Sequence, residues 1–209
     1  VKFAQKHMAS IKKKKVRIVG GKHKGAVLSV EDDQVKPTPD RVRETLFNWL
    51  SPHIEKSTVL DLFGGSGCLS FESISRGSES VLYVDSSKKA CAAFKDSLVR
   101  YRINDIRLAC RDSVQMIQEE NTHGCFDIIF IDPPYGKFEL SEILEKLYRN
   151  NWANDDSLIY LESNSCLKQL ASPKYQLVKE STAGNVYYGI LKSTSAKSAN
   201  VLHFILGPL

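Results

Sequence analysis

The segment Asp61-Leu62-Phe63-Gly64-Gly65-Ser66-Gly67 combines an acid with closely spaced glycines directly after a short apolar run. Glycines allow a sharp turn and let the backbone approach a ligand closely. The segment lacks the third glycine of a dinucleotide-binding fingerprint and the Gly-Lys-Ser/Thr of a phosphate-binding loop. A carboxylate at this place repels phosphate and attracts an ammonium or sulfonium. We therefore expect Asp61, Phe63, Gly64, Gly65 and Gly67 to bind a cationic, amino-acid-bearing cofactor; the alternative is an ordinary strand–helix turn.

Two further acids follow the next apolar runs. Asp85, which stands 18 residues after Gly67, closes Val81–Val84. A carboxylate at the end of a second strand can accept hydrogen bonds from both ribose hydroxyls of a nucleoside. Asp112 follows the third run and is a candidate acceptor for an adenine amine. Both positions also suit an acid that simply begins a helix, and for Asp112 N-capping is an equally good interpretation.

The segment Asp132-Pro133-Pro134-Tyr135 follows the predicted strand Phe126–Ile131, whose last four residues are all apolar, and gives the sharpest prediction. The prolines fix φ and remove two N–H donors, which leaves a rigid loop rich in acceptors. The Asp132 carboxylate and the Pro133 carbonyl suit an –NH₂ group with two hydrogens to donate. The Tyr135 ring offers a face on which a planar base can stack. The alternative is a strand that ends in a proline turn.

Apolar runs that alternate with helical patterns surround these segments and predict a parallel sheet covered on both faces. We expect an α/β, Rossmann-like, doubly wound sheet of seven strands, mostly parallel, with an antiparallel hairpin at its C-terminal end. The predicted strands are Thr58–Leu62, Ser80–Val84, Ile106–Cys110, Phe126–Ile131, Leu158–Leu161, Tyr175–Lys179 and Val186–Leu191. The predicted helices run from the glycine turn to about Arg76, over Ser87–Tyr101, briefly from Ser113, and over Ser141–Asn150. Ligands bind such sheets at the carboxyl edge, where the strand order reverses, so the segments at Asp61 and Asp132 should face one crevice.

A small β-hairpin and a helix are predicted ahead of the sheet. Residues 16–30 read as two short strands around a Gly/Lys turn. Thr38 is a plausible N-cap for a helix over Pro39–Leu50, whose apolar face consists of Val42, Leu46, Trp49 and Leu50. Because this helix must pack on the core, we expect the hairpin to be held as a fixed clamp beside the site.

Positive charge is concentrated at the front of the chain. Residues 1–30 carry nine Lys and Arg and no acid, which leaves −4 on the remainder of a chain with a net charge of +5. An acidic body with a basic front end suggests a polyanionic partner such as nucleic acid, although a solvated tail has the same composition. The candidate phosphate contacts are Lys12, Lys13, Lys14, Lys15, Arg17, Lys22, Lys24, Arg41 and Arg43. Arg41 and Arg43 could equally be solvated helix charges.

Composition excludes several other classes. The 209 residues are 42% hydrophobic and 25% charged, which is typical of a folded globular chain of one domain. No apolar run is long enough for a membrane helix, and the N-terminus does not have the pattern of a secretory signal. Five scattered cysteines without a CxxC pattern favour a reduced, cytoplasmic protein, and histidines without ligand spacing predict no metal site.

Taken together, DLFGGSG, Asp85 and DPPY resemble a class I S-adenosylmethionine-dependent methyltransferase that acts on an exocyclic amine. More narrowly, residues 16–192 resemble the bacterial 16S rRNA (guanine(966)-N(2))-methyltransferase family, ribosomal small-subunit methyltransferase D. The resemblance rests, in chain order, on RIVGGKHKG, KPTPDRVRETLFNWL, VLDLFGGSG, IDPPY and LIYLES. Departures are Ser86, where such enzymes often place an apolar residue against adenine, Lys36, where the family often shows Arg, and a tail beyond Lys192 without a counterpart.

The resemblance implies that the chain transfers a methyl group from S-adenosylmethionine to the N2 amine of a guanine in 16S rRNA, leaving S-adenosylhomocysteine. Asp85, Ser86, Asp112 and Ser113 would then join the first segment in holding the cofactor, and residues 132–135 would hold the target amine. The implied partner is 16S rRNA in the small subunit or its assembly intermediates, and we expect a monomer. The expected divisions are residues 1–56 for RNA contact, 57–192 for the methyltransferase core and 193–209 as a tail. Competing hypotheses are a DNA adenine-N6 methyltransferase and a non-catalytic RNA-binding assembly factor.

Overall fold

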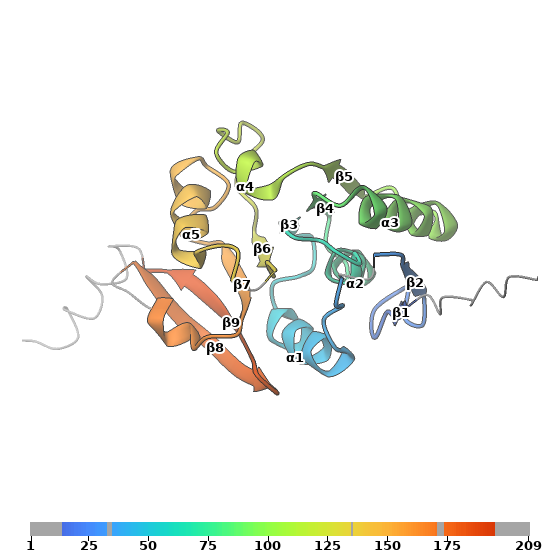
Figure 1. Cartoon of the computed structure of the whole chain (residues 1–209), viewed down its shortest axis with the longest axis horizontal. Helices are drawn as coiled ribbons and strands as arrows, with labels where there is room; N and C mark the ends of the chain where they lie inside the picture. The colour runs from blue at the N-terminus through green and yellow to red at the C-terminus, as the bar shows by residue number, and fades with distance from the viewer. Residues whose placement is uncertain (1–13, 33–34, 135, 171–173, 195–209) are drawn as a thin grey trace, which may run out of the picture.

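A computed structural model describes residues 14–32, 35–134, 136–170 and 174–194 of the chain. Figure 1 shows a central twisted sheet with helices on both sides and a separate small hairpin near one end. In chain order the elements are β1 (Lys14–Arg17), β2 (Val27–Val30), α1 (Asp40–Leu50), β3 (Thr58–Asp61), α2 (Cys68–Ser75), β4 (Ser80–Asp85), α3 (Lys88–Tyr101), β5 (Ile106–Cys110), α4 (Ser113–Met116), β6 (Ile128–Ile131), α5 (Leu140–Arg149), β7 (Leu158–Ser163), the 3₁₀ turn η1 (Leu167–Leu170), β8 (Tyr175–Ala183) and β9 (Val186–Ser193).

The main sheet has seven strands in the order β5-β4-β3-β6-β7-β9-β8. Strands β3 to β7 are parallel, whereas β9 runs antiparallel to β7 and β8 antiparallel to β9. The strand order reverses between β3 and β6, because β4 and β5 lie on one side of β3 and β6 lies on the other. The predicted doubly wound sheet with a C-terminal antiparallel hairpin is therefore confirmed.

Apolar side chains cover both faces of this sheet, which is why its central strands show no polar alternation. On one face, Val59, Ile128 and Phe130 belong to a cluster that also contains residues of α1, α2, α3 and the hairpin β1–β2. On the other face, Leu60 and Ile129 belong to a cluster with residues of α4, α5 and η1. The two clusters fix the carboxyl ends of the parallel strands as one rigid edge.

Helix α1 packs on the sheet as predicted, but it begins differently. Leu46, Phe47 and Leu50 are fully buried, and the partly buried Trp49 stacks on Tyr188 at 5.6 Å between ring centroids. The prediction that Thr38 is the N-cap is wrong: Pro39 occupies that position, and no side chain caps the helix. The Thr38 side chain instead hydrogen-bonds with Glu162 at the end of β7.

No helix within the described ranges is long and apolar enough to cross a membrane. Across the same ranges, His, Cys, Asp and Glu side chains form no group of three that could hold a metal ion.

Candidate functional site

The first predicted segment leaves β3 at Asp61 and turns into α2 through glycines. Gly67 is the N-cap of α2 with φ +73°, a left-handed conformation that side chains rarely adopt. A Cβ at Gly67 would lie 2.1 Å from the Phe94 ring of α3. The glycine is thus required both by the turn and by close packing against α3. Phe63, from the same turn, contacts Phe138 with 5.4 Å between ring centroids and so joins this turn to the segment after β6.

The Asp61 carboxylate is buried at the start of α2. Its Oδ2 accepts hydrogen bonds from the Ser70 backbone N–H at 3.2 Å and from the Ser70 hydroxyl at 2.6 Å. Burial raises the pKa of Asp61 to about 7; the Ser70 bonds oppose the rise and the negative charge of Asp85 adds to it. A cation bound next to this carboxylate would relieve the cost of keeping it charged.

Asp85 joins the end of β4 to the glycine turn. Its Oδ2 accepts from the Gly65 N–H at 2.8 Å, and its Oδ1 accepts from the Ser87 N–H at 2.7 Å. The half-buried Asp85 carboxylate therefore lies against the glycine turn that follows Asp61, as the prediction of a shared site requires. Ser86, the next residue, is exposed.

Asp112 and Ser113 follow β5 at the same edge. Asp112 is the N-cap of α4 and accepts from the Gln115 N–H at 2.8 Å. The structure therefore shows the helix-capping role that the sequence offered as the alternative to binding an adenine amine. Ser113 is buried, and its hydroxyl donates to the Leu62 carbonyl of the first turn. Both residues thus have structural partners, and Ser113 ties the β5 edge to the turn that follows β3. A role for either residue in cofactor binding stays a prediction.

Asp132 and the two prolines leave the end of β6. The register pairs Asp61 with Phe130 and Ile131 with Leu161, which places Asp132 between the ends of β3 and β7. Burial raises the pKa of the Asp132 carboxyl well above its usual range, and the negative charges of Glu162 and Asp61 raise it further. Pro133 is buried and Pro134 exposed, while Tyr135 lies outside the described residues. The structure therefore brings the segments at Asp61, Asp85 and Asp132 to one edge of the sheet.

Glu162 is a member of this edge that the sequence interpretation did not assign. It is 4% exposed and accepts a hydrogen bond from the Tyr160 hydroxyl at 2.8 Å. Burial raises its pKa, whereas the hydrogen bonds with Tyr160 and Thr38 lower it. An acid after the apolar run Leu158–Leu161 is the same signal that drew attention to Asp61, Asp85 and Asp132.

The candidate phosphate contacts divide into three groups. Lys12 and Lys13 lie outside the described residues. Exposed positions are occupied by Lys14, Lys15, Arg17, Lys22, Lys24 and Arg41. Arg43 is fully buried, so the expectation that it contacts phosphate, or is a solvated helix charge, is wrong.

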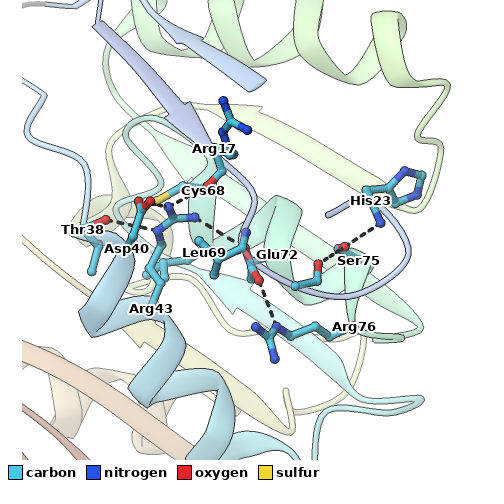
Figure 2. A network of polar contacts seen from close by, with 12 residues as sticks. Arg17, His23, Thr38, Asp40, Arg43, Cys68, Leu69, Glu72, Ser75 and Arg76 are labelled. Atoms are coloured by element: carbon cyan, nitrogen blue, oxygen red, sulfur yellow. Dashed lines mark hydrogen bonds and ion pairs between the residues drawn. The ribbon is translucent and has the colours of Figure 1, made fainter. Parts of the chain in front are cut away.

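Figure 2 shows what Arg43 does instead. Its guanidinium donates to the Arg17 carbonyl at 2.7 Å and the Thr38 carbonyl at 3.1 Å, and it pairs with Asp40 at 2.5 Å and Glu72 at 3.4 Å. A planar group with five donors can satisfy several acceptors at once, which allows a buried charge to persist. Arg43 therefore joins β1, the segment before α1, and α2.

Two hollows on the described surface lie away from the carboxyl edge. One, lined by residues of β8 such as Leu177 and Lys179, lies along the edge strand of the sheet. The other includes Ser57 and Asp127, which precede β3 and β6 and so lie at the opposite, amino edge. The convergence of acids at the strand ends, and not the depth of a pocket, marks the candidate site.

Comparisons with known proteins show the family to which the chain belongs. A family model described as "Conserved hypothetical protein 95" matches residues 16–192. The ribosomal RNA small subunit methyltransferase D of Haemophilus influenzae is 34% identical over 185 residues, which cover 87% of this chain and 95% of that protein. The protein of the same name from Escherichia coli K12 is 34% identical over 175 residues, covering 83% and 87% respectively.

A solved structure extends the likeness to three dimensions. The yhhF protein of Escherichia coli superposes with a TM-score of 0.77 at 31% identity, covering 87% of this chain and 99% of that one. The family model, which matches residues 16–192, covers all the elements from β1 to β9 except two residues at the start of β1 and one at the end of β9. It therefore includes every acid of the candidate site. The chain therefore belongs to the Conserved hypothetical protein 95 family, among the relatives named ribosomal RNA small subunit methyltransferase D.

Proposed function

We propose that the chain transfers a methyl group from S-adenosylmethionine to the exocyclic N2 amine of a guanine in 16S rRNA of the small ribosomal subunit. The observation that carries the proposal is the position of Asp61 and Asp132 where the strand order reverses, with Asp85 of the neighbouring β4 bonded to the Gly65 N–H of the same turn. Relatives at 34% identity are named for methylation of small-subunit rRNA, which supports the same substrate class here.

The residues of the first turn fit the cofactor. Asp61 and Asp85 supply negative charge, and a sulfonium or ammonium is attracted to such a place. In this proposal Asp85 accepts from ribose hydroxyls, and Asp61 favours the cationic amino-acid portion. Phe63, Gly64, Gly65 and Gly67 line the turn, and Ser86, Asp112 and Ser113 lie along the same edge. When bound, S-adenosylmethionine supplies a methyl group that is already activated for transfer.

The chain's own part in the chemistry is to position and polarise the target amine. The Asp132 carboxylate and the Pro133 carbonyl accept its two N–H groups, which favours a pyramidal nitrogen with an available lone pair. The same acceptors stabilise the positive charge that develops on that nitrogen as it bonds to the methyl carbon and the carbon–sulfur bond breaks. The raised pKa of Asp132 suits it to hold the proton that the amine then loses. Tyr135 provides the stacking face for a base turned out of its helix.

The test is a methyl-transfer assay on matched substrates. Small-subunit rRNA from cells lacking the protein, free or assembled into subunits, is treated with the protein and cofactor and compared with unmodified DNA. Nucleoside mass spectrometry should show N2-methylguanine in the rRNA, with assembled or partly assembled subunits preferred. N6-methyladenine in DNA, or no N2-methylguanine on any small-subunit substrate, would contradict the proposal. Cofactor binding without turnover on any substrate would favour the non-catalytic alternative.

A further inference from the structure

The backbone of the β1–β2 hairpin is held by side chains of α2, the helix that follows the glycine turn. Glu72 is fully buried, and its Oε2 accepts from the Val19 N–H at 2.9 Å while its Oε1 pairs with Arg76 at 2.9 Å. Arg43 approaches the same carboxylate and also binds the Arg17 carbonyl of β1 (Figure 2). A buried acid whose partners include a backbone N–H 53 residues away fixes the hairpin in one place.

Ser75, one turn further along α2, holds the hairpin turn. Its hydroxyl donates to the Gly20 carbonyl at 2.6 Å and accepts from the His23 N–H at 2.9 Å. The Ser75 carbonyl accepts from the Lys22 N–H at 2.6 Å. The His23 ring lies edge-on to Phe71 of α2, with 5.7 Å between centroids. Three polar contacts thus anchor residues 20–23, which include the exposed Lys22.

The same helix is tied to the cofactor turn. The hydroxyl of Ser70, in the first turn of α2, donates to the Asp61 carboxylate at 2.6 Å. Gly67, from the same glycine turn, is the N-cap of α2. Helix α2 therefore carries the cofactor turn at its start and the basic hairpin along its later residues. An isolated two-stranded hairpin is only marginally stable in water, so its orientation must come from its contacts with the helices. These are the bonds to α2, the Arg43 bond to the Arg17 carbonyl, and the Val27 N–H bonded to the Tyr101 hydroxyl of α3 at 2.8 Å. The exposed cations Lys22 and Lys24 consequently stand at a fixed place relative to the acids of the site.

We propose that Glu72 and Ser75 are positioning residues for the RNA substrate: they hold the hairpin on α2 so that its cations bind the RNA backbone while the target base reaches Asp132. This inference rests on the proposed function. It assigns to these buried residues a part in substrate use without any contact with RNA, cofactor or the reacting atoms.

Two glycines of the hairpin turn provide a matched test. Both have positive φ, +74° for Gly21 and +90° for Gly25, so alanine strains the backbone at either position. A Cβ at Gly21 would lie 1.9 Å from the Ser75 carbonyl oxygen, whereas a Cβ at Gly25 meets nothing within 4 Å. Gly21→Ala therefore displaces the hairpin from α2, and Gly25→Ala is the control with similar strain and no collision.

The readout is kcat and KM for small-subunit rRNA, with cofactor affinity measured separately by calorimetry. Gly21→Ala should lower kcat/KM relative to Gly25→Ala by about tenfold or more, since a misplacement of about 1 Å can reduce rates by up to about 10²-fold. The reduction should fall on kcat as well as on KM, because a displaced hairpin both misplaces the target base and weakens RNA binding. Cofactor affinity should stay within about twofold of the unaltered protein, because the turn at Asp61 is untouched.

A second pair of variants, Ser75→Ala and Ser73→Ala, alters α2 at the contact between α2 and the hairpin turn. Ser75→Ala removes the bonds to Gly20 and His23, whereas Ser73→Ala removes only a bond to the Leu69 carbonyl within α2. Both serines are buried, so the two variants face similar packing changes. Ser75→Ala should lower kcat/KM about three- to tenfold, as for the removal of hydrogen bonds, with little change from Ser73→Ala.

Salt dependence separates positioning from phosphate binding. Changing Lys22 and Lys24 to Gln should flatten the log–log dependence of RNA affinity on salt by about 0.7–0.9 for each phosphate that is no longer neutralised. Gly21→Ala and Ser75→Ala keep every cation, so their slopes should match that of the unaltered protein. Equal kcat/KM within both matched pairs, or a fall in cofactor affinity in step with kcat/KM, would overturn the inference. Failure of the unaltered protein to methylate rRNA would instead contradict the proposed function.

Discussion

Replacing Asp61 by Asn should make the folded chain more stable at pH 8 and leave its stability near pH 4 almost unchanged. The pKa of Asp61 is raised from 3.8 to about 7, chiefly by burial. A rise of about three units corresponds to ~4 kcal/mol of free energy that disfavours the charged form in the fold. Because the folded chain binds this proton more tightly than the unfolded chain, stability falls as the pH rises from about 4 to 7 and the full penalty is present above pH 7.

Asn keeps the shape and an oxygen acceptor for Ser70 but cannot ionise, so the variant should escape this penalty. Urea unfolding of both proteins at pH 4.5 and pH 8 measures the difference in free energy of unfolding. The variant's advantage should grow by up to ~4 kcal/mol between the two values. Asp127→Asn, at the opposite end of β6, is the control, since that carboxylate is exposed and bonded to Thr58. An advantage that is the same at both pH values would refute the claim that Asp61 is a desolvated acid.

The pH dependence of S-adenosylmethionine binding should show whether the negative charge of Asp61 contributes to cofactor affinity. If the ionised Asp61 attracts the cationic cofactor, affinity for S-adenosylmethionine should rise about tenfold between pH 6 and pH 8, following the ionised fraction of a group with a pKa of about 7. Asp61→Asn should bind more weakly at pH 8 and no longer show this dependence. Calorimetry at the two pH values makes the measurement, and a wild-type affinity that is flat with pH would remove Asp61 from the cofactor's charge recognition.

Further substitutions test the rest of the site. Asp85→Ala should weaken S-adenosylmethionine binding by about 1.5–3 kcal/mol, as for the removal of a charged hydrogen bond, and unchanged calorimetric affinity in a folded variant would exclude Asp85 from the cofactor site. Asp132→Ala should remove most turnover while cofactor affinity stays nearly intact, which steady-state kinetics and calorimetry together can check. Tyr135→Phe should be mild and Tyr135→Ala severe in the same assay, because stacking needs the ring; equal damage would contradict stacking. Glu162→Gln removes a negative charge that raises the pKa of Asp132, so the acidic limb of the kcat/KM profile should move to lower pH, and an unmoved limb would show that the two groups do not interact.

The fold was predictable because its strands are short, apolar and separated by helical patterns. The run Phe126–Ile131 ends where β6 ends, at Ile131, and the acid that follows is therefore at the carboxyl edge. Its start differs by two residues, since Phe126 and Asp127 precede the strand and bond with Trp152 and Thr58. The carboxyl ends of the strands, which carry the acids, were thus readable from the sequence, because burial on both faces keeps the preceding residues apolar. The prediction did not treat the charged Asp127 as the boundary at the amino end of β6.

Contacts between distant residues were not predictable in the same way. Arg43 is three residues before Leu46 and four before Phe47, so helical periodicity alone places it on the buried face. The charge argued against burial, and the partner that makes burial tolerable, Glu72, lies 29 residues away. Thr38 likewise has a good local reason to cap α1, yet its side chain binds Glu162. In both cases a tertiary partner outweighed a local preference.

The docking of the hairpin on α2 and α3 also constrains the order in which the chain can assemble. The Val19 N–H cannot bond Glu72 until α2 has been made, and the Val27 N–H bonds the Tyr101 hydroxyl 74 residues later. During synthesis, at about 5–20 residues per second, the first basic strand therefore emerges several seconds before its binding surface exists. Closing such long loops is entropically costly, so these contacts form after the local turns and helices. The basic β1–β2 hairpin thus passes through synthesis without its native support, exposed to any polyanion nearby.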